Sequence, residues 1–264
     1  MSKDREESSG NLSASWRGVL LFLLLLVLVT QRERVVTTVR GLNLLPGSVD
    51  REEMAAQRVR PLLHAELSAL GLTLGDAVLL QVLKSENLLE IWMRPRNTET
   101  YLLYKVYRLC KPTGALGPKG RLGDQVIPEG FYEGNLRSLH PYTRHYLAID
   151  LGFPNDSDRY HKRKGGMIYL GGACRGDGAL SLDNPSIEEV YTLIRESLLG
   201  GNKVYHLHVF PFRMSDQRMN ELLDSEEEVA WLDFWGNLKE GYDYFQILQR
   251  PPKPLVSEGQ YVFR

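Results

Sequence analysis

The chain has 264 residues, 43% of them hydrophobic and 25% charged, a balance that is typical of folded proteins and excludes a fibrous or wholly disordered chain. Lys and Arg total 32 and Asp and Glu total 33, so the net charge is −1 and no overall field favours nucleic acid as a partner. The two cysteines, Cys110 and Cys174, are too few for a disulfide-rich scaffold or a four-thiolate zinc site, but one bridge between them stays open.

The N-terminal part predicts a signal anchor or transmembrane segment at residues 16–31, behind a disordered polar tail at residues 1–15. Its centre, residues 19–29, is an uninterrupted apolar run that is shorter than the ~17–25 residues of a typical spanning helix. No small-x-small cleavage pattern follows at residues 30–34, so the run favours an uncleaved anchor over a cleaved signal peptide. Basic residues flank the run on both sides and predict no orientation.

A linker at residues 32–50 leads into a helical segment at residues 51–75. Apolar residues at helical spacing predict a helix here, and Gly71 is a natural end for it. Pro61 lies inside this helix and predicts either a kink or a division into two shorter helices.

The main domain is expected at residues 76–248 and begins with strand-like sequence. Val, Ile, Leu and Tyr dominate short segments that polar turns separate, a pattern that predicts strands. These segments are 77–83, 88–93, 100–109, 146–151, 167–170 and 204–210. The stretch 114–129 carries four glycines and two prolines and predicts a long loop.

A helix is predicted in the second half of the domain from its capping residues. Asn184 before Pro185, or Ser186 with Glu189, predicts its start. The glycine pair that begins at Gly200 predicts its end.

Another helix is predicted from a capping box that Ser225 and Glu228 form. We expect Gly241 to end this helix. The remaining residues, 249–264, are rich in proline and predict an extended tail.

Two histidines alternate along the predicted strand at 204–210. His206 and His208 therefore face the same side and could share a metal ion, but no third ligand is evident. A polar strand face with one buried, hydrogen-bonded histidine is the more ordinary interpretation. We accordingly expect no metal and no cofactor.

A glycine-rich loop at residues 171–178 follows a predicted strand and contains Cys174. Its backbone N–H groups could hold an oxyanion beside a Cys174 thiolate. The charge of Arg175 would stabilise that thiolate. The competing interpretation is a structural turn around a small buried cysteine. The basic run at 159–164 is typical of a solvated face and, less often, of an anion site.

Six further segments, spread over roughly residues 54–247, belong together. They are 90–93, 114–119 with 123–124, 128–132, 147–155 with 158–159, 208–214, and 234–235 with 239–245. In their residues and their order they resemble the YafK-like subgroup of the YkuD-domain L,D-transpeptidase family.

The resemblance implies a mainly β (α+β) fold, a YkuD-like β-sandwich or barrel with peripheral helices behind the N-terminal membrane anchor. It implies a protein of the cell envelope. Together with the predicted anchor, this places the protein in the inner membrane with its domain in the periplasm, or makes it an exported protein. The implied partners are peptidoglycan stem peptides or an envelope lipoprotein or other protein. The family's reaction is acyl transfer: a cysteine thiolate attacks a carbonyl of diaminopimelate, a histidine handles the proton, and loop amides hold the oxyanion.

The sequence departs from the family at both catalytic positions. The subgroup's active loop reads approximately His-Gly-Ala-Cys-x-x-x-Gly-Cys-x-x-x-x-Asn, in which the His and the second Cys are catalytic. Five shared residues fix the register: Gly172, Ala173, Cys174, Gly178 and Asn184. The histidine position is then Gly171 and the nucleophile position is Ala179, and a shift by one residue supplies neither a His nor a Cys.

Our first hypothesis is therefore a catalytically degenerate family member that binds peptidoglycan or an envelope partner. Its candidate contacts to an anionic, amide-rich ligand are Tyr169, Arg175, Asp177 and Arg213, since arginine pairs with carboxylates in a bidentate way.

The second hypothesis is an active acyl transferase or hydrolase with relocated chemistry. Cys174 would be its nucleophile and His208 or His206 its base, and pairing of Cys110 with Cys174 would remove the thiolate. A third hypothesis is a purely structural envelope module whose groove is filled or closed.

Overall fold

A computed structural model describes residues 50–175, 180–223 and 229–263. The predicted tail, membrane segment and all but the last residue of the linker lie outside these ranges. Within them, no helix combines the length and the apolar character that a membrane crossing needs.

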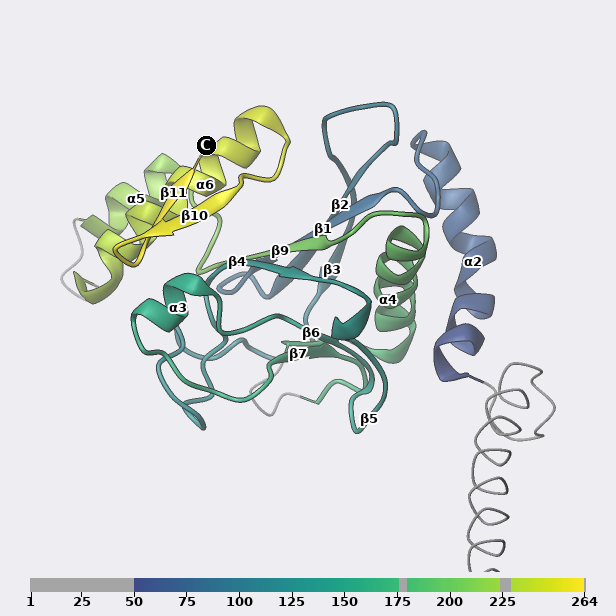
Figure 1. The fold of residues 1–264 in the computed structure, drawn as a ribbon, viewed down its shortest axis with the longest axis horizontal. Helices are drawn as coiled ribbons and strands as arrows, with labels where there is room; N and C mark the ends of the chain where they lie inside the picture. The colour runs from purple at the N-terminus through teal and green to yellow at the C-terminus, as the bar shows by residue number, and fades with distance from the viewer. Residues whose placement is uncertain (1–49, 176–179, 224–228, 264) are drawn as a thin grey trace, which may run out of the picture. The chain divides into compact units, whose positions relative to one another are not determined.

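Two sheets form the body of the domain (Figure 1). The first has five strands in the order β3-β2-β1-β9-β4, the second has four in the order β5-β6-β7-β8, and a hairpin pairs β10 with β11. The strands of the first sheet are β1 (Ala77–Leu83), β2 (Leu88–Arg94), β3 (Leu102–Arg108), β4 (Gly130–Gly134) and β9 (Tyr205–Phe210). The others are β5 (Leu139–Thr143), β6 (Tyr146–Asp150), β7 (Tyr169–Gly171), β8 (Leu180–Ser181), β10 (Pro254–Ser257) and β11 (Gln260–Phe263).

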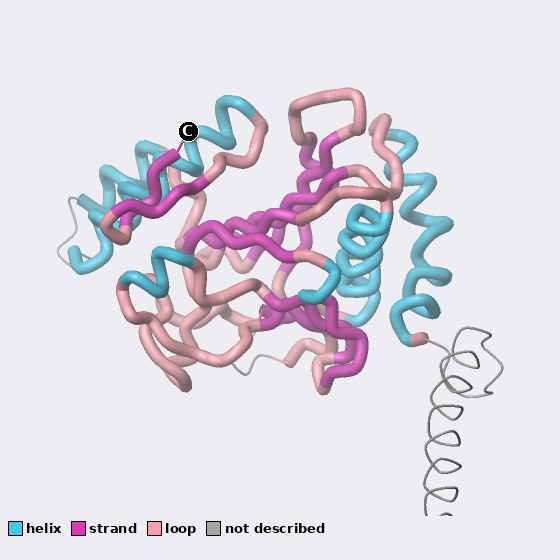
Figure 2. Tube along the Cα trace, in the orientation of Figure 1, coloured by secondary structure: helices cyan, strands magenta, loops and turns pink. Residues whose placement is uncertain are grey.

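The helices lie at the periphery of these sheets (Figure 2). They are α2 (Arg51–Ala69), α3 (Asp156–Tyr160), α4 (Asn184–Leu199), α5 (Asp216–Leu223) and α6 (Leu232–Leu248), with short 3₁₀ helices at Leu136–Ser138 and Val229–Trp231. Helix α4 packs on β1, β6 and β9, and α2 packs on α4. The predicted α+β class, with strands at the centre and helices around them, is confirmed.

The first sheet is covered on both faces. Its inner face, with Leu80 of β1 and Leu207 of β9, joins α4 and the second sheet in one apolar core. Its outer face, with Phe131 of β4 and Phe210 of β9, packs on α6 through Trp235. Because β1 is buried on both faces, all its residues are buried, which explains its continuous apolar sequence.

Helix α4 begins at Asn184, so its N-cap lies one residue before the earlier of the two predicted caps. The side chain of Asp183 accepts a hydrogen bond from the N–H of Ser186 at 2.9 Å and is the N-cap. Pro185 occupies the first turn, where its missing N–H costs nothing. Gly200 ends the helix as predicted, with its N–H bonded to the carbonyl of Glu196.

Helix α2 is a single helix, although Pro61 lies inside it. The predicted division into two shorter helices is therefore wrong. Gly71 adopts a left-handed φ of +70° just after the helix ends, which a glycine tolerates better than other residues.

The predicted helix end at Gly241 is wrong. Helix α6 continues through Gly241, because the glycine serves packing and does not end the helix: a Cβ there would lie 2.4 Å from Phe131 Cζ and 2.5 Å from Phe263 Cζ. In the segment predicted as an extended tail, two strands pair as the β10–β11 hairpin. The capping box at Ser225 and Glu228 lies outside the described residues.

The predicted long loop at 114–129 is ordered by a buried ion pair. Lys84 Nζ lies 2.7 Å from Glu129 Oε1, and both side chains are fully buried. Lys84 also donates to the carbonyls of Gly117 and Ile127, and Trp235 Nε1 donates to Glu129 Oε2. These bonds satisfy both charges and fix the loop against the first sheet and α6.

Candidate functional site

The glycine-rich loop singled out in the sequence follows β7 and leads to α4. Gly171, the last residue of β7, pairs with Ala148 of β6 on one side and with Ser181 of β8 on the other. Its carbonyl accepts a hydrogen bond from the N–H of Leu182 at 2.9 Å. Gly171, which the sequence alignment predicts to occupy the position of the family's catalytic histidine, is thus buried in the middle of a sheet.

No side chain fits at Gly171 in this arrangement. A Cβ added there would lie 2.7 Å from the Cβ of His145, closer than such atoms approach in proteins. His145 is 4% exposed, and its Nε2 accepts a hydrogen bond from Arg144 Nε at 3.1 Å. Sequence reasoning missed His145, because only the register of β6 against β7 brings it next to Gly171.

The described amides of the loop donate hydrogen bonds to neighbouring segments of the protein. The N–H of Gly172 donates to the carbonyl of His145 at 2.8 Å, that of Ala173 to Asn184 Oδ1 at 2.8 Å, and that of Cys174 to the carbonyl of Leu182 at 3.0 Å. These three donors are therefore engaged by the protein. Asp177, Gly178 and Ala179 lie outside the described residues.

Cys174 forms a disulfide with Cys110, with a Cα–Cα distance of 5.3 Å. Cys110 follows β3 of the first sheet, and its N–H donates to the carbonyl of Ser181 at 2.8 Å. The bond therefore links the loop to the other sheet and leaves Cys174 without a thiol. The hypothesis that Cys174 is a relocated nucleophile is not supported by this arrangement.

The two histidines of β9 lie on the outer face of the first sheet, away from α4. The ring of His208 packs edge-on against Phe131, Phe210 and Phe245, with centroids 4.9, 6.0 and 5.9 Å away. Burial, with a smaller effect of His206, holds the pKa of His208 well below its usual range. His206 Nδ1 lies 3.1 Å from Glu133 Oε1.

Neither histidine meets Cys174, since the first sheet lies between His208 and the α4 side of the core. The structure therefore does not bring together the nucleophile and base of the second hypothesis. Among the described residues, no group of three or more His, Cys, Asp or Glu side chains is placed to hold a metal ion.

Of the four candidate ligand contacts, Tyr169 and Arg175 lie at the loop. The ring of Tyr169 lies 5.4 Å from that of His140 and 6.0 Å from that of His145. Burial, followed by the charge of Asp150, raises the pKa of Tyr169 and keeps its hydroxyl protonated. Arg175 is exposed.

Arg213 lies elsewhere, on the first sheet. Its NH2 group donates to Glu90 Oε1 at 2.5 Å, and its backbone N–H donates to Glu86 Oε1 at 2.9 Å. These carboxylates hold the Arg213 side chain and backbone in place and neutralise its charge. Asp177, the fourth candidate, falls in the part of the loop that the structure does not describe.

No family model matches the chain. Over 189 residues it is 37% identical to proteins of Escherichia coli K12 and O157:H7 described as "Putative L,D-transpeptidase YafK", an alignment that covers 72% of this chain and 74% of each relative. Among solved structures, a variant of the helical cell shape determining protein Pgp2 from Campylobacter jejuni aligns with a TM-score of 0.42 and 17% identity, over 77% of this chain and 69% of that one.

Proposed function

Because the chain belongs to the YafK-like subgroup of the L,D-transpeptidase family, we propose that it is a catalytically degenerate member that binds peptidoglycan stem peptides without acyl transfer. One observation carries this proposal: Gly171, at the position of the family's catalytic histidine, has no room for a side chain beside His145. The nucleophile position is Ala179 in the sequence, which offers no thiol.

Acyl transfer by the family's route needs a thiolate, a proton acceptor and an oxyanion site. Ala179 cannot supply the first and Gly171 cannot supply the second. The amides of Gly172, Ala173 and Cys174 donate to neighbouring segments of the protein and are not free for the third. Loss of a covalent nucleophile alone removes on the order of 10⁶ in rate from a cysteine- or serine-type acyl enzyme.

The proposed ligand carries carboxylates and amides along a short peptide. Arg175, exposed on the loop, can pair with a carboxylate in a bidentate way. Tyr169, flanked by His140 and His145, offers a ring face and a protonated hydroxyl. These two residues are therefore the contacts we assign to the peptide.

We place the protein in the cell envelope, anchored in the inner membrane through residues 16–31 with the domain in the periplasm. The Cys110–Cys174 disulfide supports an exported location, because such bonds persist in oxidising compartments and are rare in the cytosol. Stem peptides or an envelope lipoprotein would be accessible to the domain there.

Mass spectrometry of diaminopimelate-containing muropeptides incubated with the full chain in detergent tests the absence of transfer. We expect an unchanged muropeptide profile, both under oxidising conditions and after reduction of the disulfide. New cross-links or cleaved stems that appear on reduction and are lost in Cys174→Ala would overturn the proposal and restore Cys174 as a nucleophile.

Isothermal titration calorimetry with the same muropeptides tests binding. We expect saturable binding that Arg175→Gln weakens about tenfold, the effect of one charge-assisted hydrogen bond, and that Lys203→Gln leaves unchanged. Lys203 is an exposed cation between α4 and β9, outside the loop, so the control removes the same charge elsewhere. No measurable affinity would contradict the proposal in favour of a structural module.

A further inference from the structure

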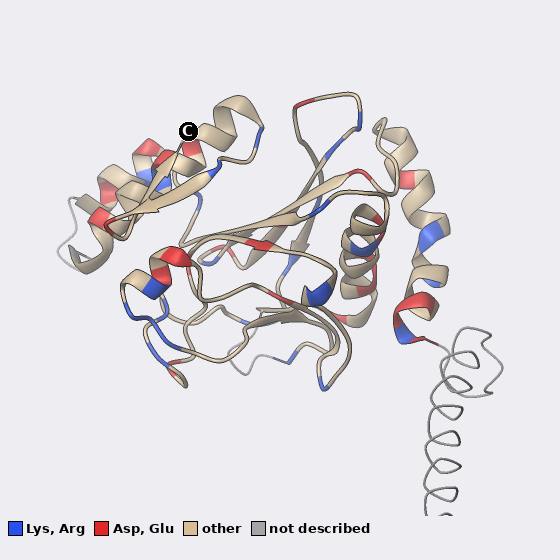
Figure 3. Ribbon diagram, in the orientation of Figure 1, with Lys and Arg blue, Asp and Glu red and all other residues tan. Residues whose placement is uncertain are grey.

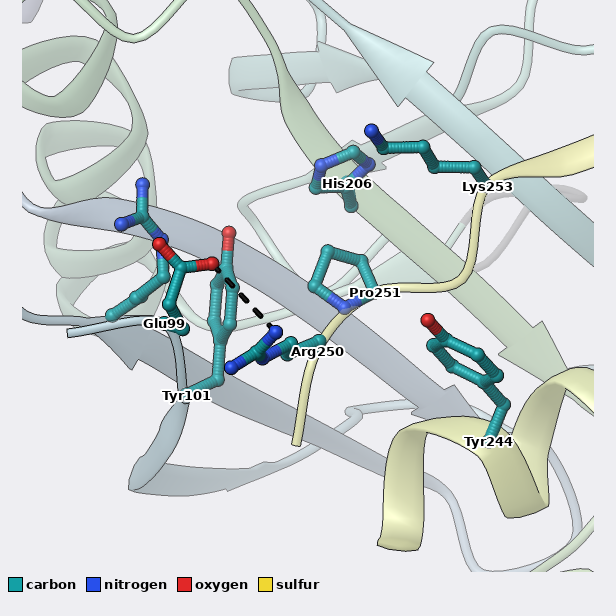
Figure 4. Close-up of a pocket in the computed structure, with 8 residues that line it drawn as sticks. Glu99, Tyr101, His206, Tyr244, Arg250, Pro251 and Lys253 are labelled. Atoms are coloured by element: carbon teal, nitrogen blue, oxygen red, sulfur yellow. Dashed lines mark ion pairs between the residues drawn. The ribbon is translucent and has the colours of Figure 1, made fainter. Parts of the chain in front are cut away.

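A cavity of about 460 Å³ lies at the opposite end of β3 from the disulfide, within the usual range for small-molecule sites (Figure 4). Tyr101, just before β3, lines it, whereas Cys110 follows the other end of that strand. At roughly 3.3 Å per residue, the two ends of this segment lie about 25–30 Å apart. The cavity is therefore separate from the loop discussed above.

The cavity is built from five separate parts of the chain. Arg94 comes from the end of β2, Glu99 and Tyr101 from the loop before β3, and His206 from the start of β9. Tyr244 comes from the end of α6, and Arg250, Pro251 and Lys253 from the segment between α6 and β10. We call it the basic cavity. The chain after α6 carries its Arg and Lys residues toward the end of β2 (Figure 3).

Positive charge exceeds negative charge in the basic cavity. Arg94, Arg250 and Lys253 face a single carboxylate, that of Glu99. Arg250 NH1 lies 3.9 Å from Glu99 Oε2, and these side chains are 50% and 75% exposed, so the pair is weak and easily exchanged. Within the described ranges, neither Arg94 nor Lys253 has a carboxylate oxygen within 4.0 Å. The cavity thus carries an excess of about two positive charges in a chain whose net charge is −1.

Arg94 is held in place before any ligand arrives. Its NH1 donates to the carbonyl of Thr98 at 2.9 Å, and its guanidinium carbon lies 5.9 Å from the centre of the Tyr101 ring. The N–H of Tyr101 donates to the carbonyl of Gln249 at 2.7 Å, which fixes the segment that carries Arg250 and Lys253. A guanidinium has five N–H donors, so Arg94 keeps donors for an anion.

The remaining walls are apolar or aromatic. Figure 4 shows Pro251 between the Arg250 side and the His206 side of the cavity, and Tyr244 of α6 directed toward it. Such a wall suits an organic group, whereas the cations suit a dianion. A single carboxylate would leave one positive charge unmatched, and arginine forks bind phosphate oxygens in pairs.

We infer that the basic cavity binds a phosphate monoester, with its phosphate against Arg94 and Arg250 and its organic group on Tyr244 and Pro251, while Lys253 on the His206 side adds to the positive field. The site does not depend on the proposed peptide binding, since it shares no residue with the loop after β7. Soluble phosphoesters and phosphate-bearing lipid headgroups both present this chemistry.

Calorimetric titration of the full chain in detergent tests the inference with phenyl phosphate, inorganic phosphate, benzoate and dihexanoyl phosphatidic acid. We expect phenyl phosphate to bind at least about tenfold more tightly than benzoate, because it brings the second negative charge. Tighter binding of dihexanoyl phosphatidic acid than of phenyl phosphate would identify a lipid as the source, and the reverse order a soluble ester.

Two variants locate the site. Arg250→Gln and Arg94→Gln should each weaken phenyl phosphate about tenfold, the effect of losing one charge-assisted contact. Arg108→Gln, which removes an exposed cation at the other end of β3, should leave it unchanged. Equal weakening by all three variants, equal affinity for benzoate, or no saturable binding below about 10 mM would overturn the inference. Because Arg250 is exposed, its substitution is compatible with folding even if that of Arg94 is not.

Discussion

The loop after β7 and the outer face of the first sheet differ in how their polar groups are satisfied. In the loop, the amides of Gly172, Ala173 and Cys174 all have partners within the protein, and a disulfide closes it. On the outer face, Gln81 Oε1 and His208 Nδ1 are buried without a hydrogen-bond partner, and the basic cavity beyond them holds three cations and one carboxylate, that of Glu99.

The bonded loop amides therefore act as framework, whereas the unpaired groups of the outer face are available to bind a ligand or water. Loop amides that are already engaged keep the loop's shape but offer little to a reacting oxyanion, and we propose that this loop has no catalytic role. Groups left without partners cost free energy in the folded state unless a ligand or water satisfies them. The predictions below test each side of this contrast.

The largest effect is expected from the disulfide that closes the loop. Cys110 and Cys174 are 64 residues apart, and a loop of this length is worth about 4 kcal/mol in the chain-entropy model. Replacement of both by Ala should lower the free energy of unfolding by about 2–4 kcal/mol, measured by urea denaturation. Wild-type protein in a reducing agent is the matched control and should lose the same amount. A loss below about 1 kcal/mol would show that hydrogen bonds alone hold the loop.

Gly171 should tolerate no side chain while His145 is present. Gly171→Ala places a Cβ 2.7 Å from the His145 Cβ, so we expect a cost of about 1–3 kcal/mol from overpacking. His145→Gly should recover much of this cost in the double variant, which a double-mutant cycle measures as coupling. Additive effects of the two substitutions would show that the strand, and not His145, excludes the side chain.

Two glycines of α6 should respond in opposite directions. Gly241→Ala would bring a Cβ within 2.4 Å of Phe131 Cζ on the outer face and should destabilise by about 1–3 kcal/mol. Gly236, five residues earlier in the helix, has no atom within 4 Å of its Cβ position, so Gly236→Ala should stabilise by about 0.5–1 kcal/mol. Thermal unfolding measures both. A neutral Gly241→Ala would mean that the helix ends early, as its sequence suggested.

Local patterns in the sequence predicted much of the fold. The segment 77–83 is β1 over the same residues, since an apolar run between turns needs no distant partner to be recognised. Strands β4 and β5 were missed, because a glycine-flanked segment such as 130–134 becomes a strand only through its pairing with β9. Gly241 was read as a helix end for the same reason: its neighbours Phe131 and Phe263 come from distant segments.

For the candidate site, too, one part could be predicted from local sequence and another part could not. Alignment with the family's loop identified Gly171 from residue identities alone. The contact of Gly171 with His145 and the bond of Cys174 to Cys110 depend on sheet register and on the approach of the two sheets, which no local pattern encodes. Likewise, the basic cavity joins five separate segments of the chain. Of its lining residues, only His206 was a candidate site residue in the sequence.

The effect expected from His208, the buried imidazole of the outer face, is small at neutral pH and grows as the pH falls. Burial lowers its pKa in the folded state, whereas the unfolded chain binds a proton at a pKa of about 6.5. The folded state is therefore favoured above about pH 6.5 and loses about 1.4 kcal/mol per pH unit as the pH falls below that value. His208→Phe fits a site lined by Phe131, Phe210 and Phe245 and should remove this part of the slope between pH 6.5 and 5 in urea denaturation.

Phe210→Leu is the matched control, because it removes a ring from the same cluster without changing a titratable group. It should lower the unfolding free energy at every pH and keep the slope of the wild type. An equal slope in wild type and His208→Phe would show that the folded protein protonates His208. Nδ1 of His208 would then have a partner in the folded protein, and the contrast with the engaged amides of Gly172, Ala173 and Cys174 would fail at this residue.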